Sequence, residues 1–195
     1  CTSLVNHDME LAEEVRDVES RLNQFEVDLD DRCVSIIAKR QPTAGDLRAI
    51  VSVMKVITDL ERIGDEADRI AKMALELADS EKPEHQYAEF RAIHANVMKM
   101  LKRTLDAFAR LDVESALRVF EDDENIDRAY NKIVRQSIEN MQSNPQEVER
   151  SVSLMWAARA LERIGDHAKN ISEYVIYQVK GHDVRHSDVA GEMLE

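Results

Sequence analysis

The six residues Leu60-Glu61-Arg62-Ile63-Gly64-Asp65 recur unchanged as Leu161-Glu162-Arg163-Ile164-Gly165-Asp166, with residue 61 matching residue 162. An amide residue followed by a proline precedes each copy, at residues 41–42 and at residues 144–145. A six-residue identity whose flanking matches keep the same order indicates an internal duplication.

The composition indicates helices. The 195 residues include only 5 Gly and 3 Pro, and 33% of them are Asp, Glu, Lys or Arg. Few Gly and Pro mean few turns, and many charged residues suit helices with one buried face and one solvated face. The chain is therefore predicted to be all-α.

Apolar residues recur at alternating steps of three and four, which is the pattern of an amphipathic helix. In the first long segment these residues are Leu11, Val15, Val18, Leu22, Phe25, Leu29, Cys33 and Ile36. Pro42 ends this segment, and Thr43 with Asp46 three residues later is an N-cap signal for the next helix. Helices are expected at residues 9–40, 43–80, 92–111, 113–142 and 146–180, with Gly181 as the cap of the last.

The first half is expected to lack most of one helix. Residues 8–12 match residues 112–116 at an offset of 104, so only the end of the helix at 92–111 has a counterpart, at residues 1–7. An intact unit should hold three helices, and long helices with short turns pack as antiparallel bundles. We therefore expect a truncated N-terminus and two tandem three-helix bundles. The expected divisions are a first bundle at 1–80, a linker at 81–91, a second bundle at 92–186 and a tail at 187–195.

Charge and cysteine content restrict the partners and the compartment. A net charge of −13 without a basic stripe argues against nucleic acid and against adsorption to anionic lipid. The two cysteines lack metal-ligand spacing, and Cys33 lies on the apolar side of a helix, so a buried free thiol in a reducing cytoplasm is expected. No run of about 18 apolar residues occurs, so no direct membrane insertion is predicted.

The repeated motif places two carboxylates on one helix face. Glu61 and Asp65 are four residues apart, as are Glu162 and Asp166, and like charges at this spacing repel by a few tenths of a kcal/mol. The mid-helix glycine of each copy costs about 1 kcal/mol more relative to alanine. A bound cation would offset the repulsion, and the missing side chain leaves room either for the ion or for a close neighbouring helix.

The preceding helix of the second half supplies two further carboxylates. Asp123 and Asp127 are again four residues apart, and antiparallel packing should place them against Glu162 and Asp166. The result would be a cluster of four carboxylates. Because the acidic positions lie beside the apolar stripe, this cluster is expected to be reachable from solvent.

The first half has a weaker version of the same cluster. At the offset of 104, Glu19 and Asn23 take the places of the two aspartates, beside Glu61 and Asp65. Such oxygen ligands suit Mg, Ca, Mn, Fe or Zn, among which the sequence does not choose.

Two alternatives to a metal site remain open. Acidic residues on helices commonly form a solvated face, and Arg62 and Arg163, each three residues before the motif aspartate, could bridge to it. The same carboxylates could also belong to a metal-dependent enzyme or a metal-storage bundle. The sequence has no Glu-x-x-His pair, no phosphate-binding loop, no nucleophile elbow and no HExxH helix, so no enzyme is predicted.

Three stretches resemble the PhoU family of phosphate-transport accessory proteins: residues 37–48 (IAKRQPTAGDLR), the two LERIGD copies and residues 177–186 (YQVKGHDVRH). The resemblance implies two similar three-helix bundles that bind metal clusters through paired E/D-x-x-x-D motifs. Carried over by position, these motifs give Glu61, Asp65, Asp123, Asp127, Glu162 and Asp166, while Glu19 with Asn23 departs from the pattern. The metal would be a divalent or trivalent ion such as Fe, Mn, Mg or Zn.

The resemblance also implies a regulatory role. Proteins of this family are cytoplasmic, associate with the membrane through partners and often form homodimers. When phosphate is plentiful, they restrain the phosphate ABC transporter, whose ATPase subunit is the expected partner, and keep its sensor histidine kinase in the repressing state. The implied function is negative regulation of phosphate uptake and of the phosphate-starvation response.

Overall fold

The computed structural model describes residues 1–6, 8–77, 87–181 and 184. Within these residues all regular structure is helical, as predicted. The helices, in chain order, are α1 (Thr2–Asn6), α2 (Met9–Arg40), α3 (Ala44–Glu76), α4 (Tyr87–Arg110), α5 (Val113–Ser143), the 3-10 turn η2 (Pro145–Glu147) and α6 (Val148–Lys180).

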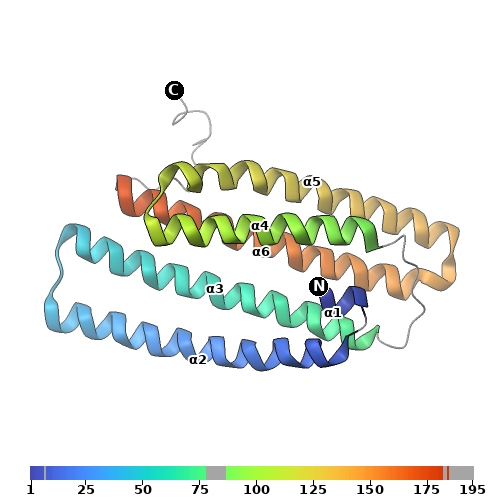
Figure 1. The fold of residues 1–195 in the computed structure, drawn as a ribbon, viewed down its shortest axis with the longest axis horizontal. Helices are drawn as coiled ribbons and strands as arrows, with labels where there is room; N and C mark the ends of the chain where they lie inside the picture. The colour runs from blue at the N-terminus through green and yellow to red at the C-terminus, as the bar shows by residue number, and fades with distance from the viewer. Residues whose placement is uncertain (7, 78–86, 182–183, 185–195) are drawn as a thin grey trace.

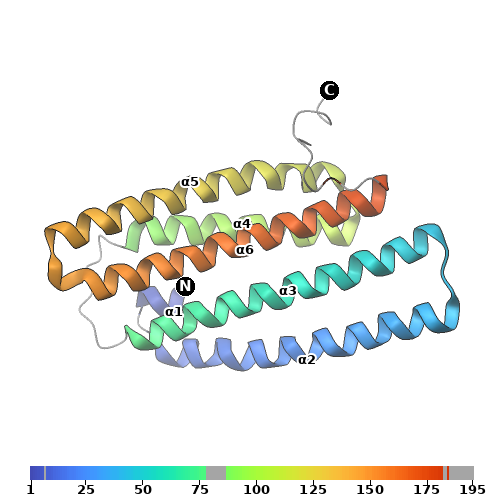
Figure 2. The same cartoon turned by 180° about the vertical axis from the view of Figure 1, so that it is seen from behind.

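The long helices lie nearly parallel to one another in an elongated molecule (Figure 1). Helix α6 packs against α4 and α5, and these three form the second bundle. Helix α3 packs against both α2 and α6, so α3 and α6 make the contact between the halves (Figure 2). The prediction of two tandem helical bundles is confirmed.

Among the described residues, the first half contains two long helices and one short helix. Helix α1 has five residues and contacts α2 and α3. In the second half α4 covers the equivalent surface, and Ile126 and Ile133 of α5 are buried. Their counterparts on α2, Leu22 and Leu29, are only partly buried, and Phe25 is 56% exposed.

Most helix boundaries follow from local sequence signals. Asp8 and Asp112, which match in the repeat, are both N-caps whose carboxylates accept a hydrogen bond from a backbone N–H three residues later. Gly181 caps α6 with a φ of 79°. Thr43 is the N-cap residue of α3, but its side chain makes no capping hydrogen bond.

Two boundaries differ from expectation. Helix α4 begins at Tyr87 rather than near residue 92, because the apolar spacing continues back to Phe90, which is fully buried. Helix α3 is described to Glu76, and its expected last residues at 78–80, residues 81–86 of the expected linker and the expected tail at 187–195 lie outside the described residues.

The main core lies where α3 and α6 meet, together with α4 and α5. Its buried side chains include Ile70, Phe90, Met100, Ile126, Leu161 and Ile171. Cys33 is a buried free thiol, as predicted. No described helix is long and apolar enough to cross a membrane.

Candidate functional site

The antiparallel packing of α5 on α6 brings the four predicted carboxylates of the second half into one neighbourhood. Asp123 and Glu162 are buried at the helix interface, while Asp127 and Asp166 are exposed beside them. Asp123 of α5 contacts Lys169 of α6 at 2.7 Å, so the α5 pair lies on the face that meets α6.

Three carboxyl groups of this cluster are harder to ionise than usual. Burial, followed by the charge of Asp166, raises the pKa of Glu162 to about 7. Partial desolvation and then the charges of Asp123 and Asp127 raise the pKa of Asp166. The pKa of Asp127 is raised by partial desolvation and by Asp123. The cluster thus concentrates negative charge in a poorly solvated place, which favours either protons or cations.

Two basic side chains border the cluster. Lys169 Nζ lies 2.7 Å from Asp123 Oδ2, and Arg159 pairs with Glu162 Oε1. Burial opposes the charge on Lys169, but the hydrogen bond to Asp123 and the negative charges of Asp123, Glu173 and Asp166 together outweigh burial and raise the pKa of the ammonium. The second oxygen of Glu162, Oε2, is buried without a hydrogen-bond partner.

The carboxylate oxygens of the cluster are ligands that suit a hard or borderline cation. In their present positions, however, the side chains do not converge on one point. Within the described residues no group of three or more His, Cys, Asp or Glu side chains converges closely enough to hold a metal ion. The unpartnered Glu162 Oε2 and the mutual repulsion of the carboxyls are what a cation would relieve. The four residues therefore fit a metal in chemistry, and metal binding stays a prediction.

The first-half cluster is assembled differently. Asn23 Nδ2 donates a hydrogen bond of 2.5 Å to Glu19 Oε1, which leaves Asn23 Oδ1 buried and without a partner. Burial, then the charges of Asp65 and Glu26, raises the pKa of Glu61, and Glu19 adds a smaller effect. Glu26, one turn beyond Asn23 on α2, is a neighbour of this cluster that sequence reasoning missed.

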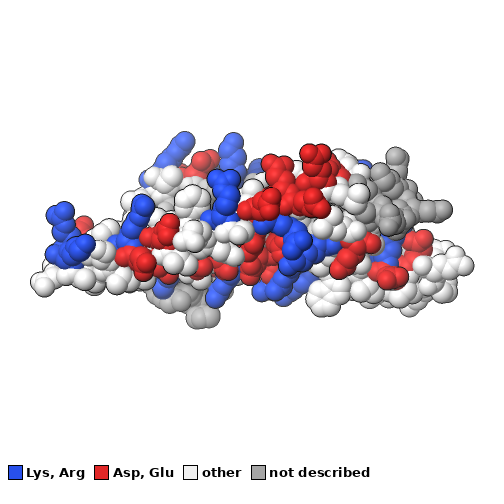
Figure 3. Space-filling model, turned by 90° about the horizontal axis from the view of Figure 1, so that it is seen from below, with Lys and Arg blue, Asp and Glu red and all other residues white. Residues whose placement is uncertain are grey.

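A polar groove between α2 and α3 adjoins the first-half cluster. Its volume is about 630 Å³, and Glu19 and Asp65 are among its lining residues. Also at this groove, Asp68 is paired with Arg16 at 3.2 Å and with Lys72 at 2.5 Å. On the face that α2 occupies, acidic and basic side chains are interspersed (Figure 3). The charge of Asp68 is therefore balanced by two neighbouring cations.

The motif glycines allow helices to approach closely. A Cβ atom added at Gly64 would lie 2.5 Å from Leu22 Cδ2, and one added at Gly165 would lie 3.3 Å from Ile126 Cδ1. Of the two uses left open by the sequence, the close neighbouring helix is the one found, so the glycines are not evidence for an ion.

One expectation is wrong in detail, and one alternative left open by the sequence is not what the structure shows for Arg163. The second cluster is not wholly beside the core, because Asp123 and Glu162 are 5% and 8% exposed, and only Asp127 and Asp166 face solvent. Arg163 bridges to Glu66 of α3 at 2.9 Å, across the contact between the halves. Arginine pairing thus joins α3 to α6 at this point.

A buried polar network between α3 and α6 was not predicted. Asp59 Oδ1 lies 2.7 Å from His167 Nδ1 and accepts a hydrogen bond of 3.2 Å from Asn170 Nδ2. Seven residues along the same face of α3, the buried Glu66 pairs with Arg163 and Arg69. The only sequence signal was an aspartate flanked by apolar residues of the helix, which does not identify its partner.

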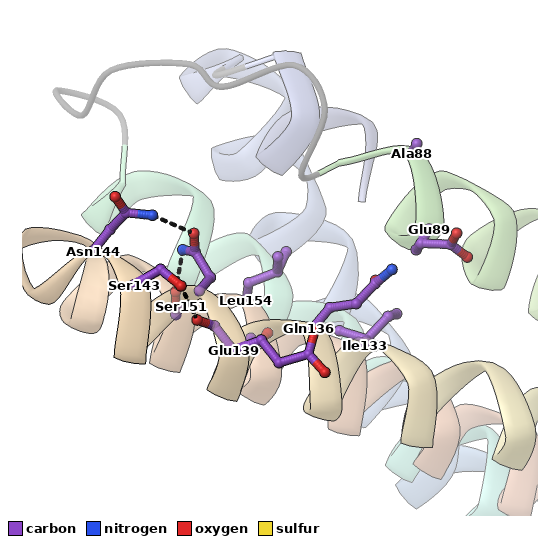
Figure 4. Close-up of a pocket in the computed structure, with 11 residues that line it drawn as sticks. Ala88, Glu89, Ile133, Gln136, Glu139, Ser143, Asn144, Ser151 and Leu154 are labelled. Atoms are coloured by element: carbon purple, nitrogen blue, oxygen red, sulfur yellow. Dashed lines mark hydrogen bonds between the residues drawn. The ribbon is translucent and has the colours of Figure 1, made fainter.

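A separate pocket of about 400 Å³ lies where α5 turns into α6, near the start of α4 (Figure 4). Asn140 Nδ2 donates to Ser151 Oγ at 3.1 Å, and Asn144 Nδ2 donates to Asn140 Oδ1 at 3.2 Å. These side chains satisfy one another and tie the turn to both helices.

Comparison with known proteins gives the same two halves. The family described as PhoU domain matches residues 1–74 and residues 90–175. The chain is 48% identical to a phosphate-specific transport system accessory protein PhoU homolog of Pseudomonas putida, covering 95% of this chain and 72% of that protein. It is 40% identical to the phosphate-specific transport system accessory protein PhoU of Escherichia coli strain K12, covering 100% and 79%.

Solved structures agree with the fold. The crystal structure of PhoU from Pseudomonas aeruginosa superposes with a TM-score of 0.89 at 45% identity and covers 93% of this chain and 87% of that one. The phosphate transport system regulatory protein PhoU from Streptococcus pneumoniae gives a TM-score of 0.85 at 28% identity, covering 93% and 85%. These relatives are named as accessory and regulatory proteins rather than as enzymes, in agreement with the prediction from sequence. On the matched domains, the repeat and the shared fold, this chain belongs to the PhoU family.

Proposed function

We propose that this chain is a negative regulator of phosphate uptake and of the phosphate-starvation response. It would act as an adaptor between the ATPase subunit of a phosphate ABC transporter and the associated sensor histidine kinase. The observation that carries the proposal is the match of two PhoU domains over most of the chain, with relatives named as phosphate transport accessory proteins. Such an adaptor works in the cytoplasm and reaches the membrane through its partners, commonly as a homodimer.

The exposed surface of α6 supports contact with other proteins. Trp156 is 61% exposed, and Val148 and Val152, eight and four residues before it on the same face, are 42% and 39% exposed. An exposed tryptophan beside other apolar side chains is typical of protein interfaces, where aromatic residues contribute much of the binding energy.

The proposal includes metal at the carboxylate clusters. In the second half Asp123, Asp127, Glu162 and Asp166 would hold a divalent or trivalent ion such as Fe, Mn, Mg or Zn. Bound there, the ion would supply positive charge and fix α5 against α6. The unpartnered Oε2 of Glu162 and the raised pKa values of its neighbours support this assignment. The first half, with Glu19, Glu61 and Asp65, would bind more weakly because Asn23 contributes no charge.

The regulatory role is tested by alkaline phosphatase activity in phosphate-rich medium. The gene is deleted and then restored on a plasmid, with an empty plasmid as the control. High activity in the deletion strain that returns to the basal level on complementation is expected. Low activity in both strains would contradict negative regulation.

The metal sites are tested with purified protein. After dialysis against Mn²⁺ or Fe³⁺, the bound metal is measured by mass spectrometry for the wild type and for the Glu162→Ala and Glu61→Ala variants. We expect the larger loss from Glu162→Ala. Equal metal content in all three proteins would contradict both sites.

A further inference from the structure

Helix α4 is a basic element in an acidic chain. Its residues include five Lys and Arg against two Asp and Glu, a net formal charge of +3, whereas the whole chain has −13. Helices α2, α3 and α5 each hold more acidic than basic residues. Helix α6 is nearly balanced, with five basic and four acidic residues, so α4 has the most positive net charge of the long helices.

The basic residues of the C-terminal half of α4 lie along one face. Lys99, Lys102, Arg103 and Arg110 line a shallow groove of about 300 Å³ together with Asp106 of α4 and Asp112 and Ser115 at the start of α5. We call the four cations the α4 basic stripe. The expectation from the sequence that no basic stripe exists is wrong here, because these cations are spread over residues 99–110 and come together only on the face of the folded helix. At 1.5 Å per residue the stripe extends about 16 Å along the helix axis.

Three cations of the stripe are available to a partner. Lys99, Lys102 and Arg110 are exposed, and no carboxylate of the described residues forms an ion pair with them. The fourth, Arg103, pairs with Asp122 of α5 and so holds the groove in place. Because these three cations make no ion pair within the described part of the chain, they can form ion pairs with a partner.

Apolar side chains accompany the stripe. Met98 is 50% exposed and Leu105 is 39% exposed, and with Lys102 between them they form the adjacent row of the helix surface. Charged and apolar groups side by side are the composition of a protein interface, in which apolar contact supplies affinity and charge supplies orientation.

We propose that the α4 basic stripe docks an acidic helix of a protein partner, with carboxylates facing the three free cations and an apolar residue against Met98 and Leu105. A single phosphate would contact only part of a surface 16 Å long. A membrane of anionic lipid would be repelled by a chain of net charge −13. A helix that carries both carboxylates and an apolar row matches the cations of the stripe as well as the exposed Met98 and Leu105.

This inference rests on the proposed function in one respect, because the expected partner is a component of the phosphate transport system. The test uses the purified transporter ATPase subunit and the cytoplasmic part of the sensor kinase from the same organism. Binding to the full chain is measured by calorimetry at low and high salt, for the wild type and for a triple variant, Lys99→Glu, Lys102→Glu and Arg110→Glu.

A matched control has the same change of charge elsewhere. Arg21→Glu, Arg32→Glu and Lys39→Glu alter three exposed cations of α2, and circular dichroism with thermal melting verifies that both triple variants fold. We expect the α4 variant to bind at least one partner at least about tenfold more weakly, with a smaller salt dependence, and the α2 variant to bind as the wild type does.

The outcomes separate the two proposals. If the wild type binds a partner and the α4 variant binds it equally well, the docking surface is wrong and the adaptor role stands. If the wild type binds neither protein, the adaptor role fails and the docking surface fails with it. Binding of inorganic phosphate or of phosphatidylglycerol vesicles that the α4 variant loses, with partner binding unchanged, would also overturn the inference, because it would assign the stripe to a different ligand.

Discussion

His167 Nδ1 lies 2.7 Å from Asp59 Oδ1, and this contact joins α6 of the second half to α3 of the first. Both side chains are buried, and Asn170 donates to the same carboxylate oxygen. Buried polar groups are costly unless they are paired, so this network stabilises one relative placement of the halves over alternatives.

The first prediction concerns this network. Asp59→Ala leaves His167 and Asn170 without their shared acceptor, and we expect the free energy of unfolding to fall by about 1–3 kcal/mol. Urea denaturation measures the loss. Leu47→Ala, at a partly exposed position earlier in the same helix, is the control and should cost less.

A double-mutant cycle shows whether the effect belongs to the pair. Asp59→Ala and His167→Ala together should cost less than the sum of the single changes, with a coupling of about 0.5–3 kcal/mol. Additive effects would mean that the two side chains stabilise the fold independently.

The second prediction is a pH dependence of stability set by Glu162. Its folded pKa of about 7 is above the ordinary value of 4.5, so between these pH values the folded state binds more protons than the unfolded state. Protonation of Glu162 therefore makes its full contribution to the free energy of unfolding below about pH 4.5. This contribution, on the order of 3 kcal/mol or less, is lost as the pH rises through about 7.

Glu162→Gln should flatten the stability profile over this pH range. Chemical denaturation at several pH values in a chelating buffer measures it, because a bound metal would mask the effect. Glu149→Gln, an exposed position on the same helix, is the control that should keep the wild-type slope. An unchanged slope in Glu162→Gln would assign the titration to another group.

Local patterns predicted the helices well, and the interfaces less well. The bounds of α2 and α6 follow from apolar spacing and from caps such as Gly181, which depend on residues close in sequence. The facing of Asp123 and Asp127 toward α6 could be predicted because antiparallel packing and the repeat together fix the register.

The contact between α3 and α6 could not be predicted in the same way. Each of these helices has more than one apolar face, and the sequence does not indicate which one meets the other half. Asp59 and His167 are 108 residues apart and do not match in the repeat, so their pairing required the folded arrangement. Burial of Glu162 was missed for the same reason, because the number of helices packed around α6 sets its depth.

The third prediction compares the two motif glycines. Alanine gains about 1 kcal/mol of helix propensity over glycine inside a helix. At Gly64 the new Cβ would meet the terminal methyl of Leu22, a partly exposed and flexible side chain that can move away. At Gly165 it would meet Ile126, which is β-branched and fully buried.

Gly64→Ala is therefore expected to be neutral or stabilising, by up to about 1 kcal/mol, and more stable than Gly165→Ala. Thermal melting of both variants against the wild type gives the order. Gly165→Val should destabilise by about 1–3 kcal/mol through overpacking. If Gly165→Ala were the more stable variant, Ile126 would have to yield more readily than its burial indicates.

The fourth prediction restores the missing carboxylate of the first-half cluster. Asn23 occupies the place that Asp127 has in the second half, and its amide donates to Glu19. In Asn23→Asp this hydrogen bond is replaced by repulsion between like charges, so the metal-free protein should lose about 1–2 kcal/mol of stability. Added Mn²⁺ should then raise the melting temperature of Asn23→Asp more than that of the wild type, because a fourth acidic group joins Glu19, Glu61 and Asp65 at the ion. Asp127→Asn removes a carboxylate from the second-half cluster, so Mn²⁺ should raise its melting temperature less than that of the wild type. If Mn²⁺ raised the melting temperatures of both variants equally, the ion would not be bound at these clusters.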